Sequence, residues 1–143
     1  MTCKWNPYCI CAAVLLLLAA VAPCAAQEAG PTEEEGDLTL VRAVMCETIA
    51  GYEPANAAVV FSINTGRISC YTSFANIPST THTTHRWFRR DVLVTTKRLA
   101  LKPPRWATYS SIQLREADKG PWRVEILDEQ DRLLSTLRFS VTD

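Results

Sequence analysis

Two serines and two histidines are the residues of this chain whose types could support catalysis. Ser110 and Ser111 could supply a nucleophile, and His82 or His85 could act as the base that activates it. A nucleophilic serine usually lies on a sharp turn that exposes its oxygen, as in the G-x-S-x-G motif. That motif is absent from the sequence, and the two serines lie in a run with the pattern of a strand. Acyl-transfer chemistry is therefore not expected, and no catalytic residue is assigned.

The same two histidines could instead bind a metal ion. His82 and His85 are three positions apart, and side chains at that spacing in a strand point to opposite faces. Two histidines without a nearby carboxylate or thiolate also form a poor ligand set. We expect one surface histidine and one half-buried histidine, with no metal and no cofactor.

Acidic residues form two further candidate sites. Asp128, Glu129 and Asp131 could surround a calcium ion, but their spacing lacks the glycine and the distant glutamate of the known calcium loop. Glu116 and Asp118 could be the carboxylate pair of a glycosidase, which must lie about 5–9 Å apart in a cleft. These two lie between an arginine and a lysine in the sequence. A solvated turn and a set of local ion pairs are the expected structures.

A set of tryptophans, arginines and one tyrosine remains, of the types that dominate protein interfaces. We expect Trp87 and Trp122 to lie in the core and Trp106 to anchor a sheet corner from inside. Arg89, Arg105 and Tyr109 are predicted to form a patch on an outer face that contacts a ligand or partner. The full set is Trp87, Arg89, Arg90, Arg105, Trp106, Tyr109 and Trp122.

The elements that must position these residues have the patterns of strands. The run from Leu38 to Cys46 alternates along the chain. "AAVVFSI" and "RISCYTSF" flank "NTG" as in a hairpin, and the runs on either side of Arg90–Asp91 indicate a second hairpin. Pro103–Pro104 would form a corner between strands. "WRVEIL" and "RLLSTLRFSV" form the predicted final hairpin, and "QLREADK" could make one helical turn. About eight short strands predict an all-β fold, an antiparallel β-sandwich of the immunoglobulin-like or jelly-roll-like kind.

The N-terminus has the composition and order of a secretory signal peptide, predicted over residues 1–26. An apolar run from Ile10 to Ala22 follows Lys4, and Cys24 and Ala26 occupy the −3 and −1 positions of a cut before Gln27. Two alternatives stay open, an uncleaved signal anchor and lipidation of Cys24 in a bacterial lipoprotein signal. Membrane association is expected only in those two cases.

Residues 27–37 form an acidic stretch with glycine and proline, predicted to be a disordered linker. Residues 38–143 are then a single domain of 106 residues. The chain as a whole has no net charge, but this domain has 14 basic and 10 acidic residues, with much of the excess between Arg86 and Arg105. That excess is too small for a dedicated nucleic-acid binder, and an exported protein is not expected to meet nucleic acid.

Two of the six cysteines, Cys46 and Cys70, lie in the predicted domain. In the oxidising compartment that a signal peptide implies, the pair is predicted to form a disulfide. The alternative is two buried thiols that behave as small hydrophobic side chains.

Several motifs in order resemble the bacterial domain-of-unknown-function family 2914. They are "THRWFRRDVLV", "PPRWATYSSIQL" and "GPWRVEILDEQDRLLSTLRFSV", with "RAVMCETIAGYEPANAAVVFSI" and "RISCYTSF" upstream, so the resemblance extends over nearly all of residues 41–143. The resemblance implies a periplasmic or cell-envelope location in a bacterium. It implies no reaction, because no catalytic residues are established for the family.

The sequence therefore predicts an exported, non-catalytic β-sandwich module that binds an envelope protein or another envelope component. The alternative is an accessory domain that binds carbohydrate or assists in its processing, through exposed tryptophan or tyrosine with arginine. An enzyme is not expected, because no catalytic constellation is present.

Overall fold

The computed structural model describes residues 37–143, and in this part of the chain it has nine strands and two short 3-10 turns. The predicted signal peptide, the possible lipidation at Cys24 and nearly all of the predicted linker lie outside the described residues. The strands are β1 (Thr39–Ala50), β2 (Glu53–Ala57), β3 (Val60–Ser62), β4 (Arg67–Ala75), β5 (Thr81–Arg89), β6 (Val92–Leu101), β7 (Trp106–Gln113), β8 (Gly120–Leu127) and β9 (Leu133–Thr142), and the turns are η1 (Ile63–Thr65) and η2 (Glu116–Asp118).

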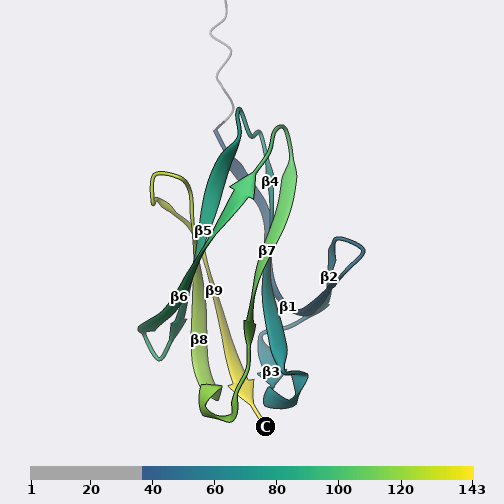
Figure 1. Ribbon diagram of the computed structural model, residues 1–143, viewed down its shortest axis with the longest axis vertical. Helices are drawn as coiled ribbons and strands as arrows, with labels where there is room; N and C mark the ends of the chain where they lie inside the picture. The colour runs from purple at the N-terminus through teal and green to yellow at the C-terminus, as the bar shows by residue number, and fades with distance from the viewer. Residues whose placement is uncertain (1–36) are drawn as a thin grey trace, which may run out of the picture. The chain divides into compact units, whose positions relative to one another are not determined.

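The strands form two sheets, which face each other in Figure 1. One has four strands in the order β2-β1-β4-β7, and the other has five in the order β3-β9-β8-β5-β6. All pairs are antiparallel except β3 with β9, which is parallel. The predicted fold class, an antiparallel β-sandwich, is confirmed, with nine strands in place of about eight and one parallel pair. No helix in the described part of the chain is long and apolar enough to cross a membrane.

The core fills the space between the sheets and is built around four aromatic rings. The Phe139 ring meets the Phe61 and Trp87 rings edge-on, at centroid distances of 5.9 and 6.2 Å, and stacks on the Trp122 ring at 6.0 Å. Along β8, Trp122, Val124 and Ile126 are buried, because alternate side chains of a strand point to the same face. The predicted core positions of Trp87 and Trp122 are confirmed.

The predicted hairpins around Arg90–Asp91 and at the end of the chain are confirmed as β5–β6 and β8–β9. The predicted hairpin around "NTG" is wrong. The turn is present as η1, closed by Gly66 in the left-handed conformation, but β3 pairs with β9 in the five-stranded sheet while β4 pairs with β1 and β7 in the other. The turn therefore carries the chain from one sheet to the other, and turn residues alone do not distinguish the two outcomes.

The connection at Pro103–Pro104 also changes sheets, from β6 to β7, and the predicted corner is confirmed. The predicted helical turn near "QLREADK" is present as η2. In β1, a bulge between Leu40 and Arg42 interrupts the alternation. Leu38 and Leu40 therefore pack against the core together with Ala43, although the uninterrupted pattern placed them on the opposite face.

Candidate binding site on the four-stranded sheet

The outer face of the four-stranded sheet has a row of apolar side chains that crosses three strands. Val44, Tyr71 and Tyr109 are partners in register on β1, β4 and β7. They point outward, because Thr72, the neighbour of Tyr71 on β4, points inward and contacts His85 of the other sheet. Beside this row lies a groove of about 470 Å³, called the aromatic groove below. Its lining residues are Ile49, Tyr52, Tyr71, Arg105, Trp106, Ala107, Thr108 and Tyr109.

Tyr52 lines this groove from the turn of the β1–β2 hairpin, which projects from the sheet in Figure 1. Gly51 and Tyr52 both have positive φ angles, of 56° and 67°, as the central residues of a type I′ turn require. A bulky residue rarely adopts this conformation. The Tyr52 side chain is 90% exposed, so the strained turn presents an aromatic ring that contributes little to packing.

Trp106 is 39% exposed, and the prediction that it anchors the corner from inside is wrong. Its partner in register, Phe74, is buried and fills the core at that end of the sheet. As the first residue of an edge strand, Trp106 instead borders the aromatic groove and an adjacent apolar hollow that includes Val41. The Lys102 ammonium lies 5.3 Å from the centre of its ring.

Tyr71 forms the floor of the groove and is almost fully buried. The Arg42 guanidinium carbon lies 5.9 Å from the centre of its ring, and Arg42 Nη1 is 3.3 Å from Glu53 Oε2. Burial raises the pKa of the Tyr71 hydroxyl above its ordinary value, and the Glu53 carboxylate acts in the same direction, against Arg42. Tyr71 is therefore neutral over the physiological range.

The structure brings together two of the three residues of the predicted patch. Arg105 and Tyr109 both line the aromatic groove, and Tyr109 is 51% exposed. Arg89 is not part of this patch, because β5 belongs to the other sheet. Its guanidinium is paired with Asp118 Oδ1 at 2.9 Å and lies 6.0 Å from the centre of the Trp122 ring.

Sequence reasoning missed Tyr52 and Tyr71. The usable signal for Tyr52 was a Gly-Tyr pair between two runs with strand character. For Tyr71 it was alternation along β4, which places Ile68, Cys70, Thr72 and Phe74 on the core face.

The structure does bring a serine and a histidine into contact, in the core. His85 Nδ1 is 2.8 Å from Ser110 Oγ, Trp87 Nε1 donates to the same oxygen at 3.0 Å, and His85 Nε2 is 3.3 Å from Thr72 Oγ1. Thr72 donates its own proton to the Thr108 carbonyl at 3.4 Å, so His85 Nε2 must be the donor to Thr72 and Nδ1 the acceptor from Ser110. The chain of hydrogen bonds joins the two sheets and satisfies a neutral imidazole.

Burial lowers the pKa of His85 to about 4, and both His85 and Ser110 are shielded from solvent. No substrate could reach the pair without opening the sandwich, and no carboxylate among residues 37–143 hydrogen-bonds to the imidazole. His82 lies apart from this network, with its Nδ1 3.1 Å from Arg98 Nη2. The contact therefore serves as a polar link in the core and not as a catalytic pair. His82 is half-buried and His85 is fully buried, so the expectation of one surface and one half-buried histidine is met only for the half-buried one.

The predicted disulfide between Cys46 and Cys70 is not formed, and both residues are buried free thiols. Cys46 is paired in register with Ser69, while Cys70 is paired with Met45. Register partners share a face, so the two cysteines point to opposite faces of the four-stranded sheet and their sulfur atoms cannot be joined without backbone movement. Burial raises the pKa of both thiols, which keeps them protonated and unreactive. The alternative of two small hydrophobic side chains describes this structure.

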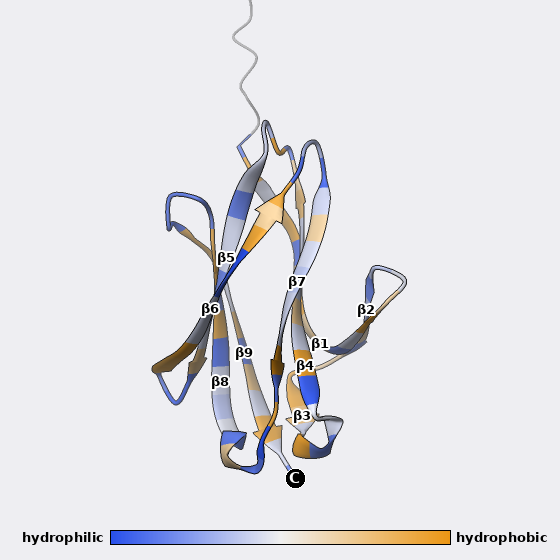
Figure 2. Ribbon diagram, viewed as in Figure 1, coloured by the Kyte–Doolittle hydropathy of each residue, from blue (hydrophilic) through white to orange (hydrophobic). Residues whose placement is uncertain are grey.

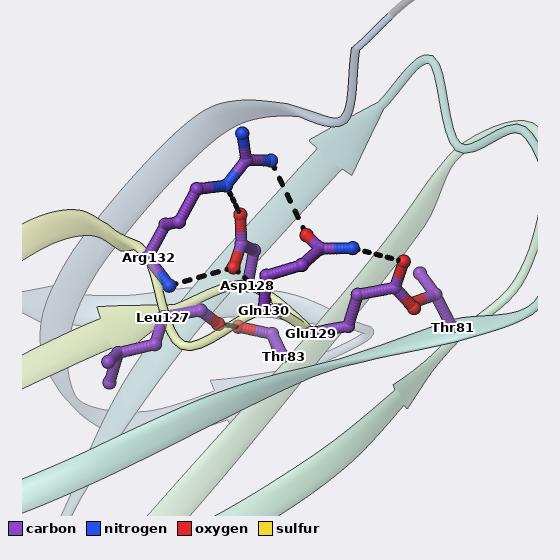
Figure 3. Close-up of polar contacts among 7 residues, drawn as sticks. All are labelled: Thr81, Thr83, Leu127, Asp128, Glu129, Gln130 and Arg132. Carbon is purple, nitrogen blue, oxygen red and sulfur yellow. Dashed lines mark hydrogen bonds and ion pairs between the residues drawn. The ribbon is translucent and has the colours of Figure 1, made fainter.

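The acidic turn at Asp128 is solvated as expected at Glu129 and Asp131, which are exposed, but Asp128 itself is buried and bonded within the turn (Figure 3). Asp128 is buried, and its Oδ1 accepts hydrogen bonds from the backbone N–H groups of Gln130 and Arg132, both at 2.9 Å. Its Oδ2 accepts from Arg132 Nε at 2.6 Å. Burial alone would raise the pKa of Asp128, but the two N–H groups and the guanidinium hold it below its ordinary value. Asp131 pairs instead with Arg86.

Glu116 forms the expected local ion pair with Lys119, but Asp118 pairs with Arg89 of β5, which is 29 positions away in the sequence. Within residues 37–143, no group of three or more histidine, cysteine, aspartate or glutamate side chains is arranged to hold a metal ion.

The structure is a β-sandwich domain with an apolar groove on the outer side of one sheet. Residues 80–141 match the family described as "Protein of unknown function (DUF2914)", so the resemblance seen in the sequence is confirmed over that segment. The match runs from just before β5 into β9. It includes the β7 side of the groove but not Tyr52 or Tyr71, and the upstream part of the resemblance stays a prediction.

No curated protein matches the chain significantly. Among solved structures, a CARDB domain from Pyrococcus furiosus, crystallised in complex with di-metal ions, is similar with a TM-score of 0.44 and 14% sequence identity. The alignment covers 74% of this chain and 88% of that domain.

Proposed function

We propose that this protein is an exported, non-catalytic binding module that holds an extended segment of a partner protein in the aromatic groove. The observation that carries the proposal is the groove itself: an apolar hollow of about 470 Å³, with one charged lining residue and three aromatic side chains left exposed around a fourth that is buried. A soluble domain rarely leaves such a surface open without a use for it.

The strand beside the groove supports a polypeptide ligand. β7 is an edge of the four-stranded sheet, and its backbone pairs with β4 on one side. Its other side can accept the main chain of an extended segment as an added strand. Side chains on the outer face of that segment would then pack beside Tyr109, and at the end of the groove Trp106 could contact the segment while Arg105 pairs with a carboxylate. Tryptophan, tyrosine and arginine are the residues that most often dominate binding energy at such sites.

The second candidate is a carbohydrate ligand, and the exposed rings of Tyr52, Trp106 and Tyr109 favour it. Aromatic rings stack on sugar faces, and Arg105 could hydrogen-bond to hydroxyl groups. The groove offers few other polar side chains, however, and sugar recognition depends on several directed hydrogen bonds. The protein ligand is therefore the better-supported one.

The test places a photoreactive phenylalanine analogue at Tyr109 in the full-length protein and cross-links intact cells. The matched control carries the analogue at Leu133, which is similarly exposed but lies on β9 in the other sheet. We expect a discrete protein adduct from residue 109 alone, with the cross-linked partner peptide mapping to one extended segment. The adduct should weaken at least about tenfold when Tyr52→Ala is added, because a single aromatic hot spot is worth about 2 kcal/mol or more.

The outcomes separate the two candidates. A glycan adduct at residue 109 would overturn the protein ligand in favour of carbohydrate. In that case soluble glycans should also shift the fluorescence of Trp106, whereas Trp87 and Trp122 are buried and should not respond. Equal adducts from residues 109 and 133, or none from a folded protein, would reject the groove as the site.

A further inference from the structure

The far end of the β5–β6 hairpin exposes three consecutive apolar side chains. Val92, Leu93 and Val94 are 68%, 51% and 52% exposed at the start of β6, immediately after the Arg90–Asp91 turn. Figure 2 shows this hydrophobic segment at the end of a hairpin that projects from the body of the sandwich. Three adjacent residues of a half-buried strand would normally alternate between core and solvent, so this exposure is a departure from the pattern.

A bulge and a strained turn produce this exposure. Phe88 pairs with Leu93 and Trp87 pairs with Thr95, so Val94 has no register partner on β5. Such a bulge increases the local twist and turns the strand away from its neighbour. Arg90 and Asp91 have φ angles of 48° and 66°, although neither is glycine. The Arg90 side chain lies against the backbone of Gly120, where an added Cβ would be 3.2 Å from Arg90 Nε, and this contact helps to hold the turn.

The same hairpin is strongly basic. From Arg86 to Arg105 there are seven basic residues and one acidic residue, Asp91. Asp91 is paired with Arg123 of β8, and Arg86 and Arg89 have carboxylate partners of their own. Three cations near the exposed segment have no carboxylate partner among the described residues: Arg90 at the turn, and Lys97 and Arg98 further along β6. All three are exposed.

We propose that this hairpin end docks on an anionic lipid surface, with Val92, Leu93 and Val94 entering the interface and Arg90, Lys97 and Arg98 contacting the headgroups. An apolar tip flanked by basic residues gains both burial of apolar surface and attraction to anionic lipid. A membrane surface is also broad enough to meet the tip and the cations spread along β6 at the same time.

Charge argues against a second copy of the chain as the occupant. β6 is an edge strand and could pair with itself, but Val92–Leu101 contains two basic residues and no acidic one. Pairing two such strands would bring like charges together, and edge lysines are a common device against such pairing.

This docking surface is distinct from the aromatic groove, since the hairpin belongs to the five-stranded sheet and the groove to the four-stranded sheet. Membrane docking and partner binding can therefore fail independently. The surface also needs neither an uncleaved signal nor a lipidated Cys24.

The test uses residues 33–143, because residues 37–143 contain every residue of the core cluster and the apolar N-terminal segment is then left out of the binding measurement. Co-sedimentation is measured with vesicles of phosphatidylcholine alone and of phosphatidylcholine with phosphatidylglycerol. We expect binding to the anionic vesicles only, and weaker binding at high salt because surface charges are screened.

Two matched pairs of variants locate the surface. The double variant Val92→Asp/Leu93→Asp should lose at least about tenfold in partitioning, since a buried apolar side chain is worth roughly that factor. Val59→Asp/Val60→Asp is the control, with residues 68% and 55% exposed at and before β3, and it should bind as the unmodified protein does. Lys97→Gln should lower partitioning about fivefold, and Arg67→Gln should not.

Each other outcome contradicts the proposal. Equal binding to neutral vesicles would remove the role of the basic residues, and equal loss in both double variants would remove the role of the hairpin. No binding to anionic vesicles by protein with a native circular dichroism spectrum would reject a lipid surface. Retention on immobilised polyglutamate in that case would instead indicate an acidic polypeptide partner.

Discussion

The outward faces of the two sheets differ in how far their aromatic side chains are covered. On the five-stranded sheet, Phe88 is covered by the Arg123 guanidinium, whose carbon lies 3.9 Å from the ring centre, and Arg123 Nε pairs with Glu125 at 3.0 Å. On the four-stranded sheet, Tyr109 and Trp106 remain exposed beside a groove. The aromatic ring on the first face is covered, and the rings on the second are not. Under the proposed function, the uncovered rings are the ones that contact the ligand.

The largest expected effect separates the tryptophan of the groove from the tryptophan of the core. Trp87→Ala should lower the free energy of unfolding by about 3–5 kcal/mol, because it empties a buried site and removes the hydrogen bond to Ser110. Trp106→Ala should cost less than about 1 kcal/mol, as surface substitutions do. Chemical denaturation at equilibrium measures both. Equal losses would mean that Trp106 supports the fold and that the groove is part of the core.

The next largest effect concerns the hydrogen bonds of His85, which join the two sheets in the core. The unfolded His85 has its ordinary pKa of 6.5 while the folded one has a pKa of about 4, so the unfolded chain binds the extra proton between these values. Stability from this group is complete above about pH 6.5 and falls as the pH drops toward 4, by roughly 3 kcal/mol in total.

Denaturation of wild type and His85→Gln across this pH range tests the link, because the variant keeps hydrogen-bonding groups but does not titrate. We expect the variant to lose less stability between pH 6.5 and pH 4. If the variant does not fold, the NMR signals of His85 in the wild type should show a neutral ring at pH 5. A protonated ring at that pH would contradict the assignment of the hydrogen-bond chain.

A smaller effect tests the covered ring on the five-stranded sheet. Arg123→Ala should lower the free energy of unfolding by about 1–2 kcal/mol, since it uncovers the Phe88 ring and removes partly buried ion pairs. Arg138 lies opposite Arg123 in register and has no carboxylate partner among the described residues. Arg138→Ala should therefore leave stability unchanged or raise it slightly, as relief of like-charge repulsion predicts. Equal losses in the two variants would show that this face is not organised around Arg123.

The smallest expected effect on stability is at Tyr52, which lines the aromatic groove. Tyr52→Gly places the residue suited to a positive φ angle in the β1–β2 turn, so the free energy of unfolding should change by less than about 1 kcal/mol. The same variant should lose the protein adduct formed from residue 109. A large loss of stability would instead mean that the Tyr52 ring is needed for folding and not kept for a ligand.

Some elements followed from local pattern. Alternation along β8 placed Trp122, Val124 and Ile126 in the core, and Pro103–Pro104 marked the corner, because strand periodicity and the missing proline N–H act within a few residues. The hairpin around "NTG" and the disulfide could not be obtained in this way. The first depends on which sheet receives β3, and the second on the register that turns Cys46 and Cys70 to opposite faces.

The residues of the candidate site also separate into those that local sequence identified and those that only the fold brought together. Arg105 and Tyr109 were identified from residue type, while Arg89 was wrongly grouped with them, and Tyr52 and Tyr71 were missed. By itself the sequence determined an all-β chain, the positions of most of its strands and the absence of a recognisable catalytic motif, because these depend on local periodicity and residue chemistry. Only the tertiary structure decided which strands share a sheet. That pairing buried Ser110 with His85, exposed Trp106 and collected the aromatic groove from three separate segments, since contacts between distant residues depend on packing and not on sequence spacing.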